Sequence, residues 1–278
     1  MKSFEVDLKK EYGTEGGKLT AILNENIYDD PVANEKWTRP AVIVVPGGAY
    51  WMVSNREGEP VATAFLSRGF QTFILTYLTA SNGEYAYPEQ LTELAAADYV
   101  KKHAKELHVN ADEVFAVGFS AGGHLTADLA VEWQNIEEIT GKKLDCKPTA
   151  VGLSYPVISE KTAYKGSHEN LLQGYTQEAK AELLKRLNLD EAVSDQTPPA
   201  FIWTTAEDNC VPSENSLMYA LQLAKRKIPY ELHVYPQGCH GLSTCDGEMS
   251  SEHKRFKRNA HWLDDCASFF RLFTKEEF

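Results

Sequence analysis

Short apolar runs along this chain alternate with segments in which apolar residues recur every three or four positions. The run Ala41–Val45 is continuous and rich in β-branched residues, which is typical of a strand buried on both faces. Comparable runs predict strands over residues 18–24, 70–78, 114–117, 150–155, 199–205 and 230–235. Helices are predicted over residues 60–68, 89–107, 125–131, 178–187, 216–225 and 252–273. This alternation predicts an α/β fold, with a mostly parallel sheet covered by helices on both faces.

The chain has 278 residues, with no internal repeat and no linker rich in proline, glycine or serine. We therefore expect a single domain, 1–278, without a large lid domain. Residues 159–197 form the only long polar insertion between predicted strands. This insertion either contributes to a substrate pocket or crosses the surface without contacting substrate.

The formal net charge of -12 excludes few functions by itself. It argues against nucleic acid or an anionic membrane surface as a partner, and it fits either a small neutral or cationic substrate or simple solubility. The first residues lack the apolar core of a signal peptide, and no stretch is apolar enough to cross a membrane. We therefore expect a cytoplasmic protein. We also expect its five cysteines to be free thiols, because no C-x-x-C pair occurs among them. Assembly into a homo-oligomer stays open.

The first candidate for chemistry is Ser120. Gly118, Ser120 and Gly122 fit G-x-S-x-G, between a predicted strand and a predicted helix. The turn must be tight, so the residues flanking the serine must be small. The alternative is that Ser120 only caps the helix that follows.

A serine hydroxyl needs a general base and a group that orients the base. In a parallel sheet such groups lie in loops after the carboxyl ends of strands. Among the eight histidines, His240 lies in a glycine-flanked loop directly after a strand. His124, one helical turn from the serine, suits a packing or hydrogen-bonding role better. Asp208 follows another strand and is the preferred acid, with Glu207 as the alternative.

Acyl transfer also needs donors for an oxyanion. We expect these from the backbone of Ala121 and of the loop containing Gly48 and Ala49, although that loop could be an ordinary turn. A metal site of Cys239, His240 and Cys245 matches no common zinc spacing, so no metal is expected. Cys210 and Cys239 flank the acid and the base, which leaves a disulfide or redox control open.

Four segments together resemble bacterial α/β-hydrolase esterases related to hormone-sensitive lipase and to the acetyl xylan and feruloyl esterases. The segments are Pro46-Gly47-Gly48-Ala49-Tyr50, Gly118-Phe119-Ser120-Ala121-Gly122-Gly123-His124, the Ala206-Glu207-Asp208 to Val211-Pro212 turn and Gly238-Cys239-His240-Gly241. The resemblance runs from about Arg39 to the end of the chain. It implies an α/β-hydrolase fold, a cofactor-independent serine esterase for short acyl groups, and deacetylation of carbohydrates such as xylo-oligosaccharides.

The resemblance also implies roles for individual residues. Ser120 would be the nucleophile, His240 the base and Asp208 its orienter, with oxyanion donors at Gly48, Ala49 and Ala121. Pro46 stands where the lipase-like loop begins with histidine, and Thr76-Tyr77-Leu78-Thr79 replaces the Asn-Tyr-Arg-Leu segment. These departures favour the sugar-esterase branch.

Tyr50 and Trp51, together with the insertion, are expected to form the acyl or sugar pocket. Two other functions stay open. A peptidase of the prolyl-oligopeptidase type has the same order of catalytic residues but a gating domain that is not seen here. A non-catalytic ligand-binding protein would normally lack one of the three residues.

Overall fold

The computed structural model describes residues 1–25, 29–83, 87–162, 165–247 and 253–275. Within these residues one sheet has eight strands in the order β1-β2-β4-β3-β5-β6-β7-β8. The strands are β1 (Lys2–Asp7), β2 (Lys18–Leu23), β3 (Arg39–Val45), β4 (Gln71–Thr76), β5 (Val109–Phe119), β6 (Val151–Ser154), β7 (Ala200–Thr205) and β8 (Tyr230–Tyr235). β2 pairs antiparallel with both β1 and β4, and all the pairs along β4-β3-β5-β6-β7-β8 are parallel. The predicted mostly parallel sheet is confirmed.

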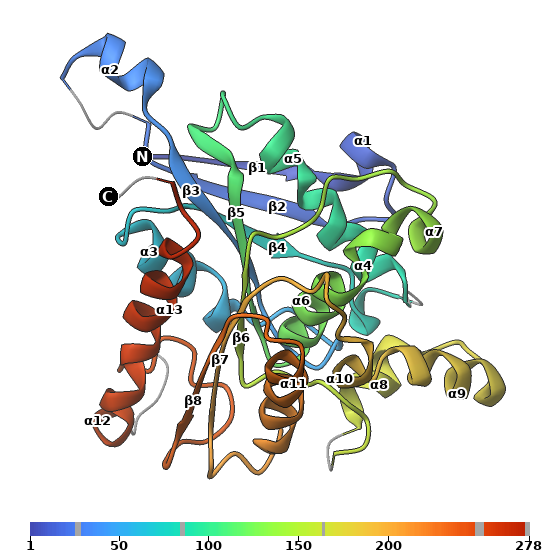
Figure 1. Cartoon of the computed structure of the whole chain (residues 1–278). Helices are drawn as coiled ribbons and strands as arrows, with labels where there is room; N and C mark the ends of the chain where they lie inside the picture. Colours follow the sequence, from blue (N-terminus) through green and yellow to red (C-terminus); the bar gives the residue numbers. More distant parts are fainter. Residues whose placement is uncertain (26–28, 84–86, 163–164, 248–252, 276–278) are drawn as a thin grey trace.

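Helices cover both faces of the sheet (Figure 1). One face carries α3 (Glu59–Leu66), α12 (His253–Phe256) and α13 (Trp262–Arg271). The other carries α4 (Glu89–Ala95), α5 (Tyr99–Lys102), α6 (Ala121–Glu132) and α11 (Glu214–Lys225). The remaining helices are α1 (Leu8–Tyr12), α2 (Pro31–Lys36), α7 (Ile136–Thr140), α8 (Gly166–Leu171), α9 (Gln177–Arg186) and α10 (Leu189–Ala192). Of the helices in these described ranges, none has the length and apolar character needed to span a membrane.

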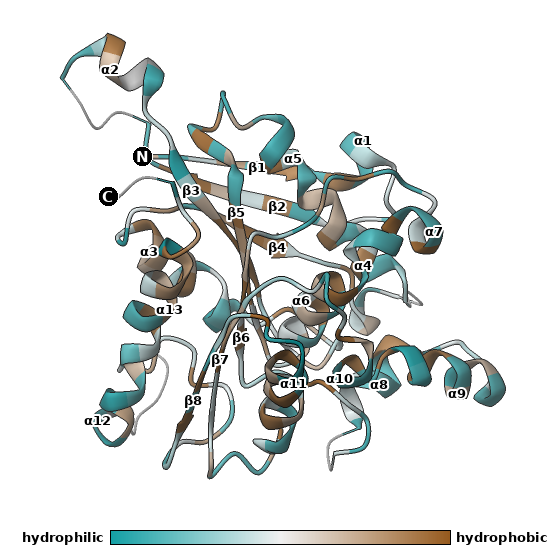
Figure 2. Cartoon of the chain, viewed as in Figure 1, coloured by the Kyte–Doolittle hydropathy of each residue, from teal (hydrophilic) through white to brown (hydrophobic). Residues whose placement is uncertain are grey.

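The core on the α13 face is built from aromatic rings. Phe115 of β5 stacks on Phe270 with ring centroids 4.4 Å apart, and Trp203 of β7 stacks on Trp262 at 5.2 Å. Burying each such side chain contributes about 1.5–3 kcal/mol. The apolar residues therefore follow the central strands, while α9 and α12 are largely hydrophilic (Figure 2).

The predicted elements differ from the observed ones at their ends and in one helix, and strand β1 and the short helices α1, α2 and α7 were not predicted. The helix predicted over 89–107 is divided into α4, a 3₁₀ turn (Ala96–Asp98) and α5. Strand β1 was not predicted, because in this edge strand Val6 alone is buried and no apolar pattern marks it. Residue 252, the expected start of the last helix, lies outside the described residues.

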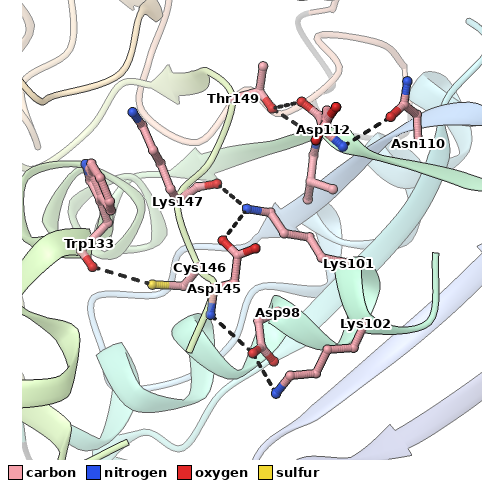
Figure 3. Close-up of polar contacts among 11 residues, drawn as sticks. Asp98, Lys101, Lys102, Asn110, Asp112, Trp133, Asp145, Cys146, Lys147 and Thr149 are labelled. Atoms are coloured by element: carbon pink, nitrogen blue, oxygen red, sulfur yellow. Dashed lines mark hydrogen bonds and ion pairs between the residues drawn. The ribbon is translucent and has the colours of Figure 1, made fainter. Parts of the chain in front are cut away.

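A polar network closes the amino end of β5, away from Ser120 (Figure 3). Lys101 Nζ donates to Asp145 Oδ1 and to the carbonyl of Lys147, at 2.9 Å each. The buried Asp98 pairs with Lys102 at 2.8 Å and accepts the N–H of Asp145 at 3.3 Å. These bonds attach the segment before β6 to α5, so they support the sheet at the end opposite the candidate site.

Candidate active site

Ser120 lies on the turn between β5 and α6, with φ 53° and ψ -116°. A positive φ is strained for a residue with a side chain and is typical of a nucleophile held above a sheet. The Ser120 side chain makes no capping bond to α6, so the helix-cap alternative is wrong. A Cβ on Gly118 would lie 2.2 Å from the carbonyl oxygen of Gly122, and one on Gly122 would lie 2.2 Å from that of Val45. The small residues that the sequence predicts here are required by this close approach.

Three side chains from three loops form one hydrogen-bonded chain. Ser120 Oγ lies 2.8 Å from His240 Nε2, and His240 Nδ1 lies 2.7 Å from Asp208 Oδ2. Since a carboxylate only accepts, Nδ1 carries the proton and Nε2 is left to accept from the serine hydroxyl. The other oxygen of Asp208 accepts the N–H groups of Cys210 at 3.0 Å and Val211 at 2.9 Å. The structure thus brings together the three residues predicted from sequence.

Glu207, the alternative acid, has a different position. Its Oε2 accepts the N–H of Gly238 at 3.2 Å and pairs with Arg255 at 3.1 Å. Glu207 therefore contacts the loop that carries His240 but not the imidazole itself. Of the two candidate acids, Asp208 is the one that contacts His240.

The loop after β3 has the backbone expected for donors. Gly48, Ala49 and Tyr50 all have positive φ, at 123°, 55° and 55°. The carbonyl of Gly48 accepts the N–H groups of Trp51 at 2.9 Å and Met52 at 3.1 Å, which closes the turn. Within the described ranges, the N–H groups of Gly48, Ala49 and Ala121 have no hydrogen-bond partner. Of these three residues, Gly48 and Ala49 line the cavity at Ser120, and Ala121 directly follows Ser120.

A cavity of about 390 Å³ opens at Ser120. This volume lies at the low end of the range for small-ligand sites. Its walls come from the loop after β3, the following 3₁₀ turn η1 (Asn55–Glu57) and the loops after β7 and β8. They comprise Gly48, Ala49, Met52, Ser54, Asn55, Arg56, Glu57, Ser120, Cys210, His240 and Gly241.

The expected pocket residues Tyr50 and Trp51 do not line this cavity. Tyr50 is only 1% exposed because its ring is turned inward and its hydroxyl bonds to His124, whereas Trp51 is 55% exposed on the surface. Among the described residues of 159–197, none lines the cavity either. The structure therefore places neither Tyr50 nor Trp51 in the wall of this cavity, and their contact with substrate stays a prediction.

His124 has a hydrogen-bonding role, as predicted, and its partner is Tyr50 of the loop after β3. It is fully buried, its Nδ1 accepts from the Tyr50 hydroxyl at 2.9 Å, and its Nε2 donates to the Leu187 carbonyl at 3.2 Å. Burial, reinforced by the neighbouring His168, lowers the pKa of His124 to about 3. The ring therefore stays neutral and keeps this bonding pattern at neutral pH.

Two residues of the site were missed by the sequence reasoning. The buried Glu57 accepts the Gly47 N–H at 2.8 Å and the Tyr155 hydroxyl at 2.7 Å. Tyr155 also accepts the N–H of Ser243 at 2.9 Å, and its ring lies edge-to-face with His240, centroids 5.0 Å apart. Glu57 thus links the loop after β3 to Tyr155, whose ring packs against His240. A single glutamate in a polar loop has no pattern from which this could be predicted.

The cysteines are all free thiols. Cys210 lines the cavity, and burial raises the pKa of its thiol. Cys245 is buried and donates to the carbonyl of Ser243, while Cys239 is exposed. In the part of the chain that the structure describes, no group of three metal-ligating side chains converges.

The family model named BD-FAE matches residues 26–223. The chain is 34% identical over 223 residues to endo-1,4-beta-xylanase B of Butyrivibrio fibrisolvens, covering 78% of this chain and 35% of that protein. It is 31% identical over 209 residues to an acetylxylan esterase of Xylanibacter ruminicola, covering 73% of this chain and 41% of the relative. The chain thus spans between a third and a half of the length of these relatives.

The structure is similar to that of an acetyl ester-xyloside bifunctional hydrolase from Caldicellulosiruptor lactoaceticus. The TM-score is 0.75 at 30% identity, covering 92% of this chain and 88% of that one. The match supports the fold expected from the resemblance. The chain has the α/β-hydrolase fold and belongs to the BD-FAE family.

Proposed function

We propose that this protein is a serine carboxylesterase that removes acetyl groups from small carbohydrates such as xylo-oligosaccharides. The observation that carries the proposal is the hydrogen-bonded chain from Ser120 through His240 to Asp208. Ser120 and His240 of this chain line the cavity. Each link has the length and direction that proton transfer from a serine hydroxyl requires.

In the proposed mechanism, His240 Nε2 accepts the hydroxyl proton while Ser120 Oγ bonds to the ester carbonyl carbon. The carbonyl oxygen becomes an oxyanion, and the N–H groups of Gly48, Ala49 and Ala121 stabilise its charge. Collapse breaks the bond to the alcohol, which leaves with the proton from His240. Water then attacks the acetylated serine, with His240 as base, and releases acetate and the free hydroxyl.

The role proposed for Asp208 is to hold the imidazole in the tautomer that accepts from serine. Asp208 also stabilises the imidazolium that forms during each step. The two backbone N–H groups on its second oxygen fix the carboxylate, because they leave it one free direction, toward His240.

Two observations support a small acyl group and a sugar. The cavity volume of about 390 Å³ leaves little space beyond a short acyl chain and one ring. The names of the relatives include an acetylxylan esterase and a hydrolase of acetyl esters and xylosides. The sugar part of the proposal depends on these names alone. The chain spans less than half the length of its curated relatives.

The test compares four substrates: p-nitrophenyl acetate, longer p-nitrophenyl esters, acetylated xylo-oligosaccharides and an aminoacyl anilide. We expect the acetyl esters to be cleaved fastest and the anilide to be stable. Ser120→Ala should abolish this turnover, whereas Ser67→Ala, on the exposed end of α3, should retain it. Full activity of Ser120→Ala would refute the mechanism, and fast anilide cleavage would favour a peptidase.

A further inference from the structure

Arg56 gives the cavity a charge that the proposed chemistry does not use. It lies on η1, is exposed, and lines the same cavity as Ser120 and His240. In the residues described, its guanidinium has neither a hydrogen bond nor an ion pair. A Cβ on Gly241 would lie 3.4 Å from Arg56 Nη2. The guanidinium therefore reaches the loop that holds His240.

The backbone that carries Arg56 is fixed on both sides. Its carbonyl accepts the Ser243 hydroxyl at 2.6 Å, from the loop after β8. The next residue, Glu57, is buried and bonded to Gly47 and Tyr155. The backbone of Arg56 is thus held between the loop that carries the proposed oxyanion donors and the loop that carries His240. Its side chain is left free to contact a ligand.

Charge in the cavity favours an anion near Arg56. Among the described lining residues, Arg56 alone carries a fixed positive charge. Glu57 is the lining carboxylate near it, and both of its oxygens already accept hydrogen bonds. The whole chain has a formal charge of -12, so a cation that has no partner among the described residues and lies beside Ser120 differs from its surroundings. A planar guanidinium matches a carboxylate through two parallel hydrogen bonds.

We propose that Arg56 forms a carboxylate subsite, so that the preferred substrate is an acetyl ester whose alcohol part carries a carboxylate, as a uronic acid does. The inference rests on the proposed esterase function. An acetyl group is too small to carry a second acid group, which places the carboxylate on the alcohol. Arg56 then determines specificity, and the bond-breaking steps are those already described.

The test uses 4-acetoxybenzoate and its neutral methyl ester, and the measured quantity is the ratio of their kcat/KM values. Dividing the ratio of the wild type by that of Arg56→Gln cancels the different reactivity of the two esters. We expect this quotient to be about tenfold, the usual size for a hydrogen-bonded charge in a partly exposed site. Arg56→Lys should recover part of it, and Arg226→Gln, on the exposed end of α11, should match the wild type. A quotient near one would overturn the subsite.

Binding separates this inference from the proposed function. The amide 4-acetamidobenzoate resists hydrolysis and can be titrated calorimetrically whether or not the protein cleaves esters. The wild type should bind it about tenfold more tightly than Arg56→Gln, and the difference should shrink in high salt. Equal binding would refute the carboxylate subsite even if esters are cleaved, whereas absent ester cleavage with tighter wild-type binding would refute the esterase alone.

Discussion

Asn170 Nδ2 donates a 2.8 Å hydrogen bond to the carbonyl of Ala49, across 121 positions of sequence. Asn170 belongs to α8 in the insertion 159–197, and Ala49 belongs to the loop with the proposed oxyanion donors. The insertion therefore contacts the site from outside the cavity, through the backbone of this loop. An oxyanion hole depends on donors that are in place before the charge forms, and this bond fixes the peptide that directly follows the one with the Ala49 N–H.

Replacing Asn170 tests whether the insertion positions the loop. Asn170→Ala should lower kcat about tenfold with little change in KM, because donors displaced by a fraction of an ångström stabilise the transition state less. The control is Gln173→Ala, since Gln173 follows α8 but donates instead to the carbonyl of Gly83. Steady-state kinetics on p-nitrophenyl acetate measures kcat and KM for both variants. Equal kcat values for the two variants would exclude the positioning role.

Tyr50→Phe distinguishes a support from a substrate contact. The change leaves the buried Nδ1 of His124 without its donor, which should cost about 1–3 kcal/mol in the free energy of unfolding. Urea denaturation measures this loss, and kinetics should show a reduced kcat with KM unchanged. A raised KM with unchanged stability would instead support the original prediction that Tyr50 contacts substrate.

Gly48→Ala tests the conformation of the loop itself. At φ 123° a side chain is strained, and the new Cβ would lie 2.0 Å from the carbonyl oxygen of Met52. The loop must move, so kcat should fall at least about a hundredfold, the size of losing an oxyanion donor. Gly141→Ala is the matched control, since φ is 69° but nothing lies within 4 Å of the Cβ. It should cost about 1 kcal/mol of stability and no activity.

Replacing Asp208 should lower kcat far more than replacing the neighbouring Glu207. Asp208→Asn should lower kcat by about 10³–10⁴, because an amide beside Nδ1 no longer selects the tautomer that accepts from serine. Glu207→Gln should change kcat only a few-fold, because Glu207 contacts Gly238 and Arg255 rather than the imidazole. Measuring kcat of both variants on one acetyl ester shows which carboxylate orients His240. A larger loss for Glu207→Gln would reverse the assignment.

Much of the site could be predicted because strand order and loop chemistry constrain it. Ser120 and Asp208 follow the buried strands β5 and β7, His240 follows the partly exposed edge strand β8, and parallel strands bring their carboxyl ends to one edge. The glycines around Ser120 were predicted from the tightness of the turn, and the backbone distances at Gly118 and Gly122 show why no side chain fits.

What could not be predicted depends on the direction of single side chains. Tyr50 follows the loop glycines in sequence, but its positive φ turns the ring toward His124 and away from the cavity. Glu57 and Arg56 are adjacent on η1, yet one is buried and the other exposed. Such choices are made by tertiary contacts such as the hydroxyl of Tyr155, which no local pattern encodes.

Asp128 of α6 should make stability depend on pH. The side chain is fully buried, and burial, with the nearby Glu132, raises its pKa from 3.8 to about 8. Between these two values the folded state holds a proton that the unfolded state has released. Stability is therefore greatest below the ordinary pKa and falls as pH rises toward 8, by about 1.4 kcal/mol per pH unit at most.

Asp128→Asn removes this titration while preserving the shape of the side chain. The free energy of unfolding of the variant should fall less steeply than that of the wild type between pH 5 and about 8, and the two slopes should converge above that range. Urea denaturation at several pH values measures both curves. Asp190→Asn is a useful comparison, because burial raises the pKa of Asp190 as well but leaves that carboxyl nearer the surface, so its effect should be smaller. Parallel curves for wild type and Asp128→Asn would show that Asp128 ionises in the folded protein at its ordinary pKa, with its charge stabilised inside α6.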